Sequence, residues 1–221
     1  MTVALIRHVR NGRKALHEAG EEAARRAVRT ACRASHREIA LESVAIEKDA
    51  MGKPHGLISG ELSPVAVSIS HSFPFAFAVA SVIPGICLGA DIERIRPLSA
   101  AVIDAFLTKR EAKLLARLPP HEQRVELVRC WSLKESVLKA IGIGLRMHPR
   151  RVDISQIIGA KGKSHISIGI DDVMHKVRIW SSLMGNEYIA TAIAIPTTST
   201  YYGSVNLKRR SALYGNSRCS S

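Results

Sequence analysis

Strand-forming segments occur in two groups along this chain, and a long stretch with helical character separates them. An Ala-, Arg- and Glu-rich segment at residues 15–37 comes first and predicts a helix, since it contains one glycine and no proline. β-Branched clusters bounded by Gly, Pro or Ser then predict strands at residues 43–47, 65–70, 75–82 and 86–92. Runs of strands set apart from runs of helices are typical of an α+β fold.

The middle and the C-terminal part of the chain complete this pattern. Residues 99–118 and 121–141 predict helices that Pro119 and Pro120 interrupt, and Gly142 suits the end of the second helix. Further strands are expected at residues 152–158, 165–170, 177–183 and 188–195. A helix followed by strands thus occurs on each side of residues 84–85. This order is compatible with two similar lobes, although the residues themselves show no clear repeat.

The composition is that of an ordinary globular protein, with 46% hydrophobic and 23% charged residues in 221. No segment approaches the ~18 consecutive apolar residues of a membrane span, and the N-terminus does not resemble a secretory signal. The four cysteines form no CxxC pair, which argues against a zinc site and a disulfide framework. We therefore expect a soluble, cytoplasmic chain with no membrane partner.

The formal net charge of +13 favours an anionic partner, because the summed field of a protein steers association. Part of this charge lies in a tail at residues 203–221 that contains no acidic side chain, where we expect disorder. A basic nucleic-acid-binding protein would explain the charge. However, an aromatic content of 5% offers little for base stacking, and the acidic motif described next would have no role. We therefore expect no nucleic-acid partner.

Asp91 and Glu93 follow an apolar strand and are separated by one residue. Residues i and i+2 of a strand point to the same face, so the two carboxylates converge and repel each other unless a cation lies between them. Mg²⁺ prefers oxygen ligands and commonly takes one or two carboxylates. The alternative is an exposed strand end where both acids pair with Arg94, Arg96 or water.

Trp131, Glu135 and Lys139 are spaced by four residues in the second middle helix and therefore share one face, with Lys134 beside it. Such a stripe is often a solvated ion pair next to a buried aromatic anchor. Together with the strand motif it permits another chemistry, in which a third carboxylate completes a cation site and two lysines neutralise a polyphosphate.

Upstream residues offer further phosphate contacts. Lys53 lies between Gly52 and Pro54 in a turn, and Ser70 and His71 end a strand, although each feature alone is common in loops. Arg25, Arg29 and Arg33 form a basic stripe on the first helix. Neither a complete dinucleotide-binding glycine motif nor a Walker loop is present.

Taken in order, four motifs resemble the signature set of the phosphopantetheinyl transferase superfamily. They are Gly52-Lys53-Pro54, Ser70-His71-Ser72, Gly89-Ala90-Asp91-Ile92-Glu93 and the segment from Trp131 to Lys139. The length resembles the larger, monomeric type, which includes the surfactin and enterobactin synthetase activators. The resemblance implies two similar α+β lobes related by a pseudo-twofold axis, at residues 1–85 and 86–202, with the active site in the cleft between them.

The resemblance also implies roles for individual residues. Asp91, Glu93 and Glu135 correspond to magnesium ligands, and Asp91, Glu135 and Lys139 to the catalytic group. Contacts to coenzyme A are expected from Lys53, Pro54, Ser70, His71, Lys134, Lys139, Arg25 and Arg33, with His71 on the 3′-phosphate.

The implied activity is Mg²⁺-dependent transfer of 4′-phosphopantetheine from coenzyme A to a serine of an acyl or peptidyl carrier protein, with release of adenosine 3′,5′-bisphosphate. Either Glu135 or a metal-bound water that it orients takes the serine proton. Carrier proteins are typically acidic, so the positive charge of this chain would steer them toward it.

Overall fold

The computed structural model describes residues 1–7, 12–60, 64–160 and 164–197. The basic tail expected at residues 203–221, and the last residues of the expected second lobe, lie outside the described residues.

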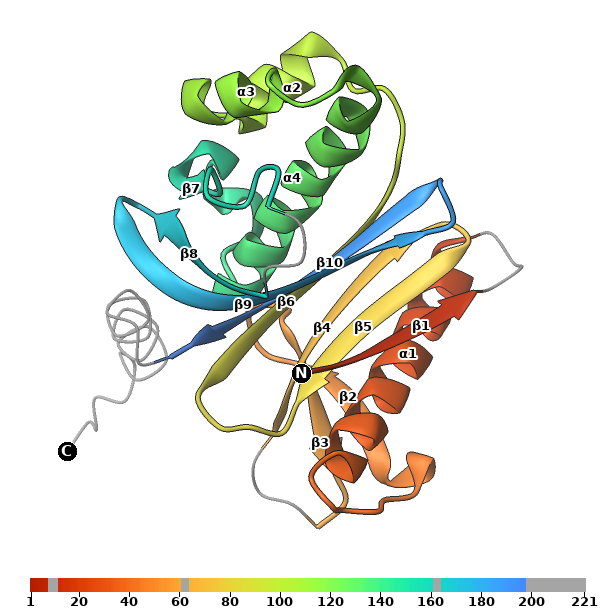
Figure 1. Cartoon of the computed structure of the whole chain (residues 1–221). Coiled ribbons are helices and arrows are strands. Elements are labelled where there is room, and N and C mark those ends of the chain that lie inside the picture. The colour runs from red at the N-terminus through yellow and green to blue at the C-terminus, as the bar shows by residue number, and fades with distance from the viewer. Residues whose placement is uncertain (8–11, 61–63, 161–163, 198–221) are drawn as a thin grey trace, which may run out of the picture.

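The N-terminal part of the chain forms one antiparallel sheet with one long helix on it (Figure 1). The helix covers the sheet with small side chains, since Ala23, Ala24, Ala27 and Val28 are fully buried. Small residues allow the helix to lie close to the strands. The elements are β1 (Thr2–Arg7), α1 (Arg13–Arg33), β2 (Val44–Lys48), β3 (Pro54–Ile58), β4 (Val65–Ser72) and β5 (Phe75–Ser81), and the strand order is β1-β5-β4-β3-β2.

The C-terminal part forms a second antiparallel sheet, and its long helix α4 packs on one face. Its elements are β6 (Ile86–Arg94), α2 (Ala100–Phe106), α3 (Lys109–Leu115), α4 (Pro120–Ile141), β7 (Val152–Asp153), β8 (His165–Ile170), β9 (Val173–Met184) and β10 (Tyr188–Pro196). The strand order is β6-β10-β9-β8-β7. Each sheet thus has its first strand at one edge and its last strand beside it. Short 3₁₀ helices lie at Leu41–Ser43, Gly144–Arg146 and Pro149–Arg151.

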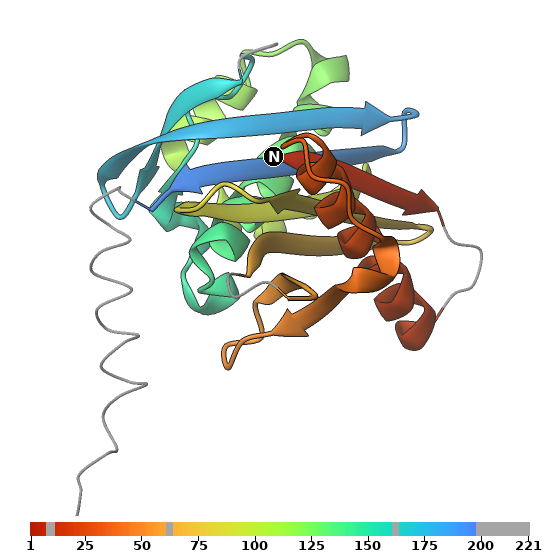
Figure 2. The ribbon, with the colours of Figure 1, turned by 90° about the horizontal axis from the view of Figure 1, so that it is seen from below.

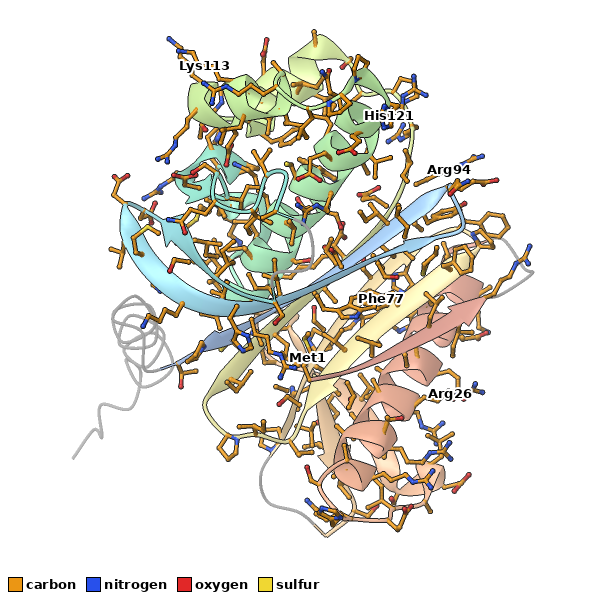
Figure 3. All side chains as sticks on the ribbon, viewed as in Figure 1. Met1, Arg26, Phe77, Arg94, Lys113 and His121 are labelled. Atoms are coloured by element: carbon orange, nitrogen blue, oxygen red, sulfur yellow. The ribbon has the colours of Figure 1, made fainter. Side chains whose placement is uncertain are left out.

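The two sheets lie against each other (Figure 2). Both supply side chains to an apolar layer between them. Phe77 and Val79 of β5 pack with Leu88 and Ala90 of β6 in this layer. Phe77 also stacks on Trp180 of β9, with 5.7 Å between the ring centroids. Figure 3 shows Phe77 in the middle of the molecule, whereas side chains such as Lys113 lie at its periphery. The two sheets therefore share a core.

The α+β class expected from the sequence is confirmed, and most strands and helices lie where they were expected. The expected strand at residues 152–158 is wrong beyond Asp153, where the chain turns. Ile154 and Ile157 are apolar because they enter the core under α4, not because they belong to a sheet. The helix expected at residues 99–118 is two helices, since Thr108 caps the start of α3 with a capping box.

Strands β1 and β3 were not expected. β3 starts at Pro54, a first-strand position that proline tolerates because it has no N–H to donate. Among the described residues, no helix has the length and apolar character that crossing a membrane requires.

Candidate active site

The carboxylates of β6 lie on the face of the sheet that α4 covers. Leu88, Ala90 and Ile92 point into the layer between the sheets, so by strand alternation Asp91 and Glu93 point the other way. Asp91 is only 4% exposed. Its Oδ1 accepts hydrogen bonds from Ser70 Oγ and Lys139 Nζ, each at 2.8 Å. A carboxylate of one sheet is thereby joined to a serine of the other sheet and to the long helix.

Helix α4 approaches β6 closely at Gly89. A Cβ atom at this position would lie 1.7 Å from the carbonyl oxygen of Ser136, so only glycine allows the approach. Beside it, the Thr191 hydroxyl of β10 lies 2.7 Å from Ser132 Oγ and 2.8 Å from Ser136 Oγ, and all three side chains are fully buried. Thr191 pairs with Asp91 across the sheet. These contacts fix α4 over the carboxylates.

Sequence reasoning assigned no role to Gly89, Ser132, Ser136 or Thr191 in positioning the site. A glycine inside an apolar strand often marks a close approach of another backbone, and Gly89 is such a signal. The hydroxyl contacts have no comparable signature, since they join residues 55 and 59 positions apart.

Glu93 and Glu135 share the surroundings of Asp91. Burial, followed by the negative charge of Asp91, raises the pKa of Glu93 above its usual value. The same two causes, in the same order, raise the pKa of Glu135. Glu93 Oε1 accepts a hydrogen bond from the indole N–H of Trp131 at 3.0 Å, and the Trp131 ring packs edge-on against Phe106. The sequence-predicted acids are thus brought together, and they repel one another.

The oxygen atoms of this group suit a hard divalent cation. Asp91 Oδ2 and Glu135 Oε1 are buried and have no hydrogen-bond partner, and buried polar atoms normally have one. A cation that takes carboxylate oxygens would satisfy both atoms. Within the described part of the chain, however, no group of three or more His, Cys, Asp or Glu side chains is arranged to hold a metal ion. The ammonium of Lys139 lies against Asp91 instead.

Lys53 and Lys139 line one cavity between the two halves of the chain. The cavity has a volume of about 240 Å³, with Lys53, Pro54 and Ser68 on the N-terminal side and Lys139 and Gly142 on the C-terminal side. Lys53 Nζ donates to the Ala140 carbonyl at 2.7 Å, and Lys139 Nζ donates to Ser70 Oγ at 3.0 Å. Two ammonium groups thus face a space that adjoins the carboxylates.

Three other expected phosphate contacts lie apart from this cavity lining. His71 is exposed, and its Nε2 lies against Gly20 of α1, on the face opposite to Ser70. The Arg25 guanidinium donates to the carbonyls of Val44 and Leu41 and so ties α1 to the start of β2. Arg33 pairs with Glu38 at 3.2 Å on the surface.

Lys134 is the clearest departure from the expected coenzyme A contacts. Its side chain is fully buried and forms an ion pair with the equally buried Glu111 at 2.8 Å. It also donates to the carbonyls of Pro149 and Val152. Burial lowers the pKa of Lys134, and Glu111 opposes that shift. With its donors used inside the protein, Lys134 joins α4 to α3 and to the start of β7 in this structure and does not line the cavity.

Comparison with known proteins adds independent evidence. Residues 87–193 match the family model of the 4′-phosphopantetheinyl transferase superfamily. Over 105 residues the chain is 27% identical to "4′-phosphopantetheinyl transferase psf-1" of Bacillus pumilus, a match that covers 48% of this chain and 42% of that protein. Over 60 residues it is 35% identical to "4′-phosphopantetheinyl transferase ffp" of Bacillus subtilis, which covers 27% of each chain.

Both matches cover less than half of the relatives' own length. The matched family segment nevertheless contains α4 and most of β6, the elements that carry Asp91, Glu93, Glu135 and Lys139. The segment at residues 87–193 is therefore similar to the 4′-phosphopantetheinyl transferase superfamily, as the motifs indicated.

Proposed function

We propose that this chain is a Mg²⁺-dependent 4′-phosphopantetheinyl transferase. It moves the phosphopantetheine arm of coenzyme A onto a serine hydroxyl of an acyl or peptidyl carrier protein and releases adenosine 3′,5′-bisphosphate. The observation that carries this proposal is the meeting of Asp91, Glu93, Glu135 and Lys139, from β6 and α4, beside a cavity that both halves of the chain line.

Magnesium would be held by Asp91, Glu93 and Glu135. Two of these residues offer buried oxygens without a hydrogen-bond partner, and Lys139 would exchange its contact with Asp91 for one with an anionic ligand. When bound, Mg²⁺ supplies charge stabilisation for a reacting pyrophosphate. The chain itself supplies the positions of these carboxylates, through Gly89 and the hydroxyl group of Thr191.

Coenzyme A would occupy the cavity between the two halves, with its pyrophosphate between Lys53 and Lys139. Pro54 and Ser70 flank these lysines. His71 and Arg25 lie apart from the cavity lining and would contact the nucleotide end where it extends beyond the cavity toward β4 and α1. The cavity volume of about 240 Å³ holds only part of such a ligand. The remainder would lie in the open ends of the space.

In the transfer step, the serine oxygen of the carrier forms a bond to the β-phosphorus as the bond from that phosphorus to the bridging oxygen breaks. The leaving group is adenosine 3′,5′-bisphosphate. Glu135, or a water that it orients, takes the serine proton. Lys139 lies where it can neutralise charge that develops on the phosphate oxygens.

The proposal also includes the relation between the two halves of the chain and the charge of its partner. The two halves act as lobes related by a pseudo-twofold axis, with boundaries near residues 1–85 and 86–202, and their matching strand orders support this relation. The net charge of +13 suits an acidic carrier protein. A monomeric state and a cytoplasmic location stay predictions.

The decisive test incubates the full chain with coenzyme A, an apo carrier protein and Mg²⁺, and then determines the carrier mass by mass spectrometry. We expect a mass increase of one phosphopantetheine unit, and we expect none when a chelator replaces Mg²⁺. An unchanged mass for carriers from fatty-acid, polyketide and peptide systems alike would refute the transferase proposal.

Two isosteric variants test the assigned residues. Asp91→Asn and Glu135→Gln keep the shape of each side chain but remove its charge, and each should lower the transfer rate by at least ~100-fold, the lower range for lost acid–base catalysis. Circular dichroism checks that the fold is retained. Wild-type rates in either variant would contradict the roles given to these carboxylates.

A further inference from the structure

A second, larger cavity lies away from the carboxylates. Its volume is about 680 Å³, within the ~300–1,000 Å³ typical of small-molecule sites. Ile86 of β6 lines it, and strand alternation places Ile86 on the face opposite to Asp91 and Glu93. The cavity therefore adjoins the layer between the sheets and is separate from the proposed transfer site.

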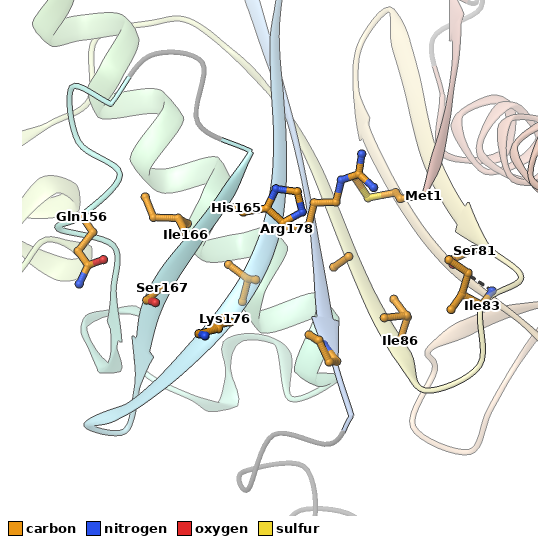
Figure 4. A pocket seen from close by; sticks show the side chains of 13 residues that line it. Met1, Ser81, Ile83, Ile86, Gln156, His165, Ile166, Ser167, Lys176 and Arg178 are labelled. Carbon is orange, nitrogen blue, oxygen red and sulfur yellow. Dashed lines mark hydrogen bonds between the residues drawn. The ribbon is translucent and has the colours of Figure 1, made fainter.

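The strand register divides this cavity into a cationic side and an apolar side. On β8 and β9, Arg178 pairs with His165, and Lys176 pairs with Ser167. On β10 and β6, Pro196 pairs with Ile86. Figure 4 shows the Arg178 side chain reaching from β9 toward Met1, with Lys176 and Ser167 farther along the sheet and Ile83 and Ile86 on the other side.

The two strong cations of this cavity have no acidic neighbour. Lys176 and Arg178 are exposed, lie two residues apart on one face of β9, and form no ion pair with any acidic side chain in the described part of the chain. Among the residues that the structure describes, no Asp or Glu lines the cavity. Because like charges side by side on a sheet repel each other, this arrangement favours an anionic ligand.

Several kinds of ligand match either the charge of this cavity or its apolar surface, but not both. The chain's own tail, which follows β10 in sequence, carries Lys208, Arg209 and Arg210, whose charge has the same sign as that of Lys176 and Arg178. An inorganic anion would leave Ile83, Ile86 and Pro196 in contact with water. A neutral apolar molecule would leave the cations without a partner.

We propose that this cavity binds a medium-chain aliphatic carboxylate. The carboxylate lies on Arg178 and Lys176, and the alkyl chain crosses β10 toward Ile86 and Ile83. Arg binds carboxylates with two parallel hydrogen bonds, which orients the head group. The path from β9 across β10 to β6 spans two inter-strand spacings, roughly 10 Å, which matches an extended medium-length alkyl chain. This inference does not depend on the proposed transferase activity.

Isothermal titration calorimetry of the full chain with decanoate, below its critical micelle concentration, tests the proposal. We expect saturable binding at one site. Each buried methylene contributes about fourfold in affinity, so octanoate, which is two methylenes shorter, should bind roughly fifteenfold more weakly. Decanol, which has the same chain without the charge, should bind more weakly than decanoate.

Charge-removing variants distinguish this site from general adsorption. Arg178→Gln should weaken decanoate binding by about tenfold, as expected for a charge-assisted pair, and should leave decanol binding unchanged. Lys113→Gln, which removes one exposed charge from α3, is the matched control and should bind decanoate like the wild type. No binding of decanoate, or equal binding by wild type and Arg178→Gln, overturns the proposal.

Discussion

At the scale of single residues, two lysines of α4 that lie five positions apart have different surroundings. Lys134 is fully buried against Glu111, whereas Lys139 is partly exposed and contacts Asp91 and Ser70. Both belong to the motif that resembles the transferase superfamily. Their neighbours indicate that Lys134 maintains the fold, whereas Lys139 lies at the candidate site.

Replacing each lysine by Met separates these roles. Lys134→Met leaves the buried Glu111 carboxylate without its counter-charge, and breaking a buried pair in this way typically costs ~3–5 kcal/mol of unfolding free energy. Lys139→Met removes a cation whose side chain is 30% exposed, so it should cost less stability than Lys134→Met, but it should lose transfer activity. Urea unfolding and the carrier mass assay measure the two effects.

The double variant Lys134→Met/Glu111→Gln provides the control. It removes both charges while the Gln side chain can still accept from Thr108 or Ile154, as Glu111 does. Part of the lost stability should return. If Lys134→Met instead weakened coenzyme A binding without changing stability, Lys134 would be a ligand contact as first expected.

The stability of the folded protein should depend on pH through His175 of β9. His175 is 2% exposed, and this burial lowers its pKa. The folded state therefore holds the neutral form, and stability is lost as the pH falls below the ordinary histidine pKa of about 6.5, because the unfolded chain binds the proton more readily. The slope reaches ~1.4 kcal/mol per pH unit for one proton.

Thermal unfolding of wild type and His175→Gln between pH 7.5 and 5 measures this dependence. The variant should show a smaller fall in Tm over the same range. The exposed His121 supplies a control, since His121→Gln should leave the wild-type slope unchanged. Parallel curves for wild type and His175→Gln would contradict the assignment.

The sequence alone predicted the relative placement of those candidate-site residues that lie in regular strands and helices. Strand alternation placed Asp91 and Glu93 together, and helical spacing placed Glu135 and Lys139 on one face, which the structure bears out. The surroundings of Lys134 could not be predicted, because its partner Glu111 comes from another helix, 23 residues away. Periodicity identifies which face a residue occupies but not what lies opposite.

At the scale of elements, the distance between α4 and β6 determines whether Glu135 and Lys139 lie beside Asp91. Gly89 permits the contact with the Ser136 carbonyl, and the hydroxyls of Ser132, Ser136 and Thr191 hold the register of the helix on β10. A shift of α4 would move Glu135 and Lys139 away from Asp91 together.

Gly89→Ala tests this dependence. The new Cβ would lie 1.7 Å from a backbone oxygen, so α4 must move, at a cost of at least the ~1–3 kcal/mol typical of overpacking. We expect the variant to be less stable. We also expect it to lose transfer activity under conditions in which it is still folded. Gly60→Ala, in a turn where nothing lies within 4 Å, should cost about 1 kcal/mol and keep full activity. Wild-type transfer by Gly89→Ala would refute the positioning role.

Element prediction failed where burial and strand character give the same pattern. Ile154 and Ile157 are apolar because they fill the core below α4, but a short apolar run does not distinguish a buried turn from a strand. β1 was missed although Val3 and Leu5 alternate with inward-facing residues, since its outer side chains are apolar as well. Both cases depend on packing partners that local sequence does not contain.

At the scale of the whole molecule, the two sheets are joined by a core that neither completes alone. Phe77 of β5 is 1% exposed and stacks on Trp180 of β9, and the layer around them contains side chains of both halves. The hydrogen bonds of Ser70 with Asp91 and Lys139 cross the same boundary. We therefore expect the halves to unfold together, although chains of this size often unfold in steps.

Guanidinium unfolding followed by far-UV circular dichroism and by tryptophan fluorescence tests this cooperativity. The two curves should coincide in one transition, because loss of either sheet exposes the apolar face of the other. Phe77→Ala should shift both curves together by ~3–5 kcal/mol, since it leaves a cavity in the shared layer. Val3→Ala, at an exposed position of the edge strand β1, is the control and should change stability by less than about 1 kcal/mol. Two separate transitions, with Phe77→Ala moving only one of them, would mean that each half folds on its own and that the site is assembled by docking of two finished units.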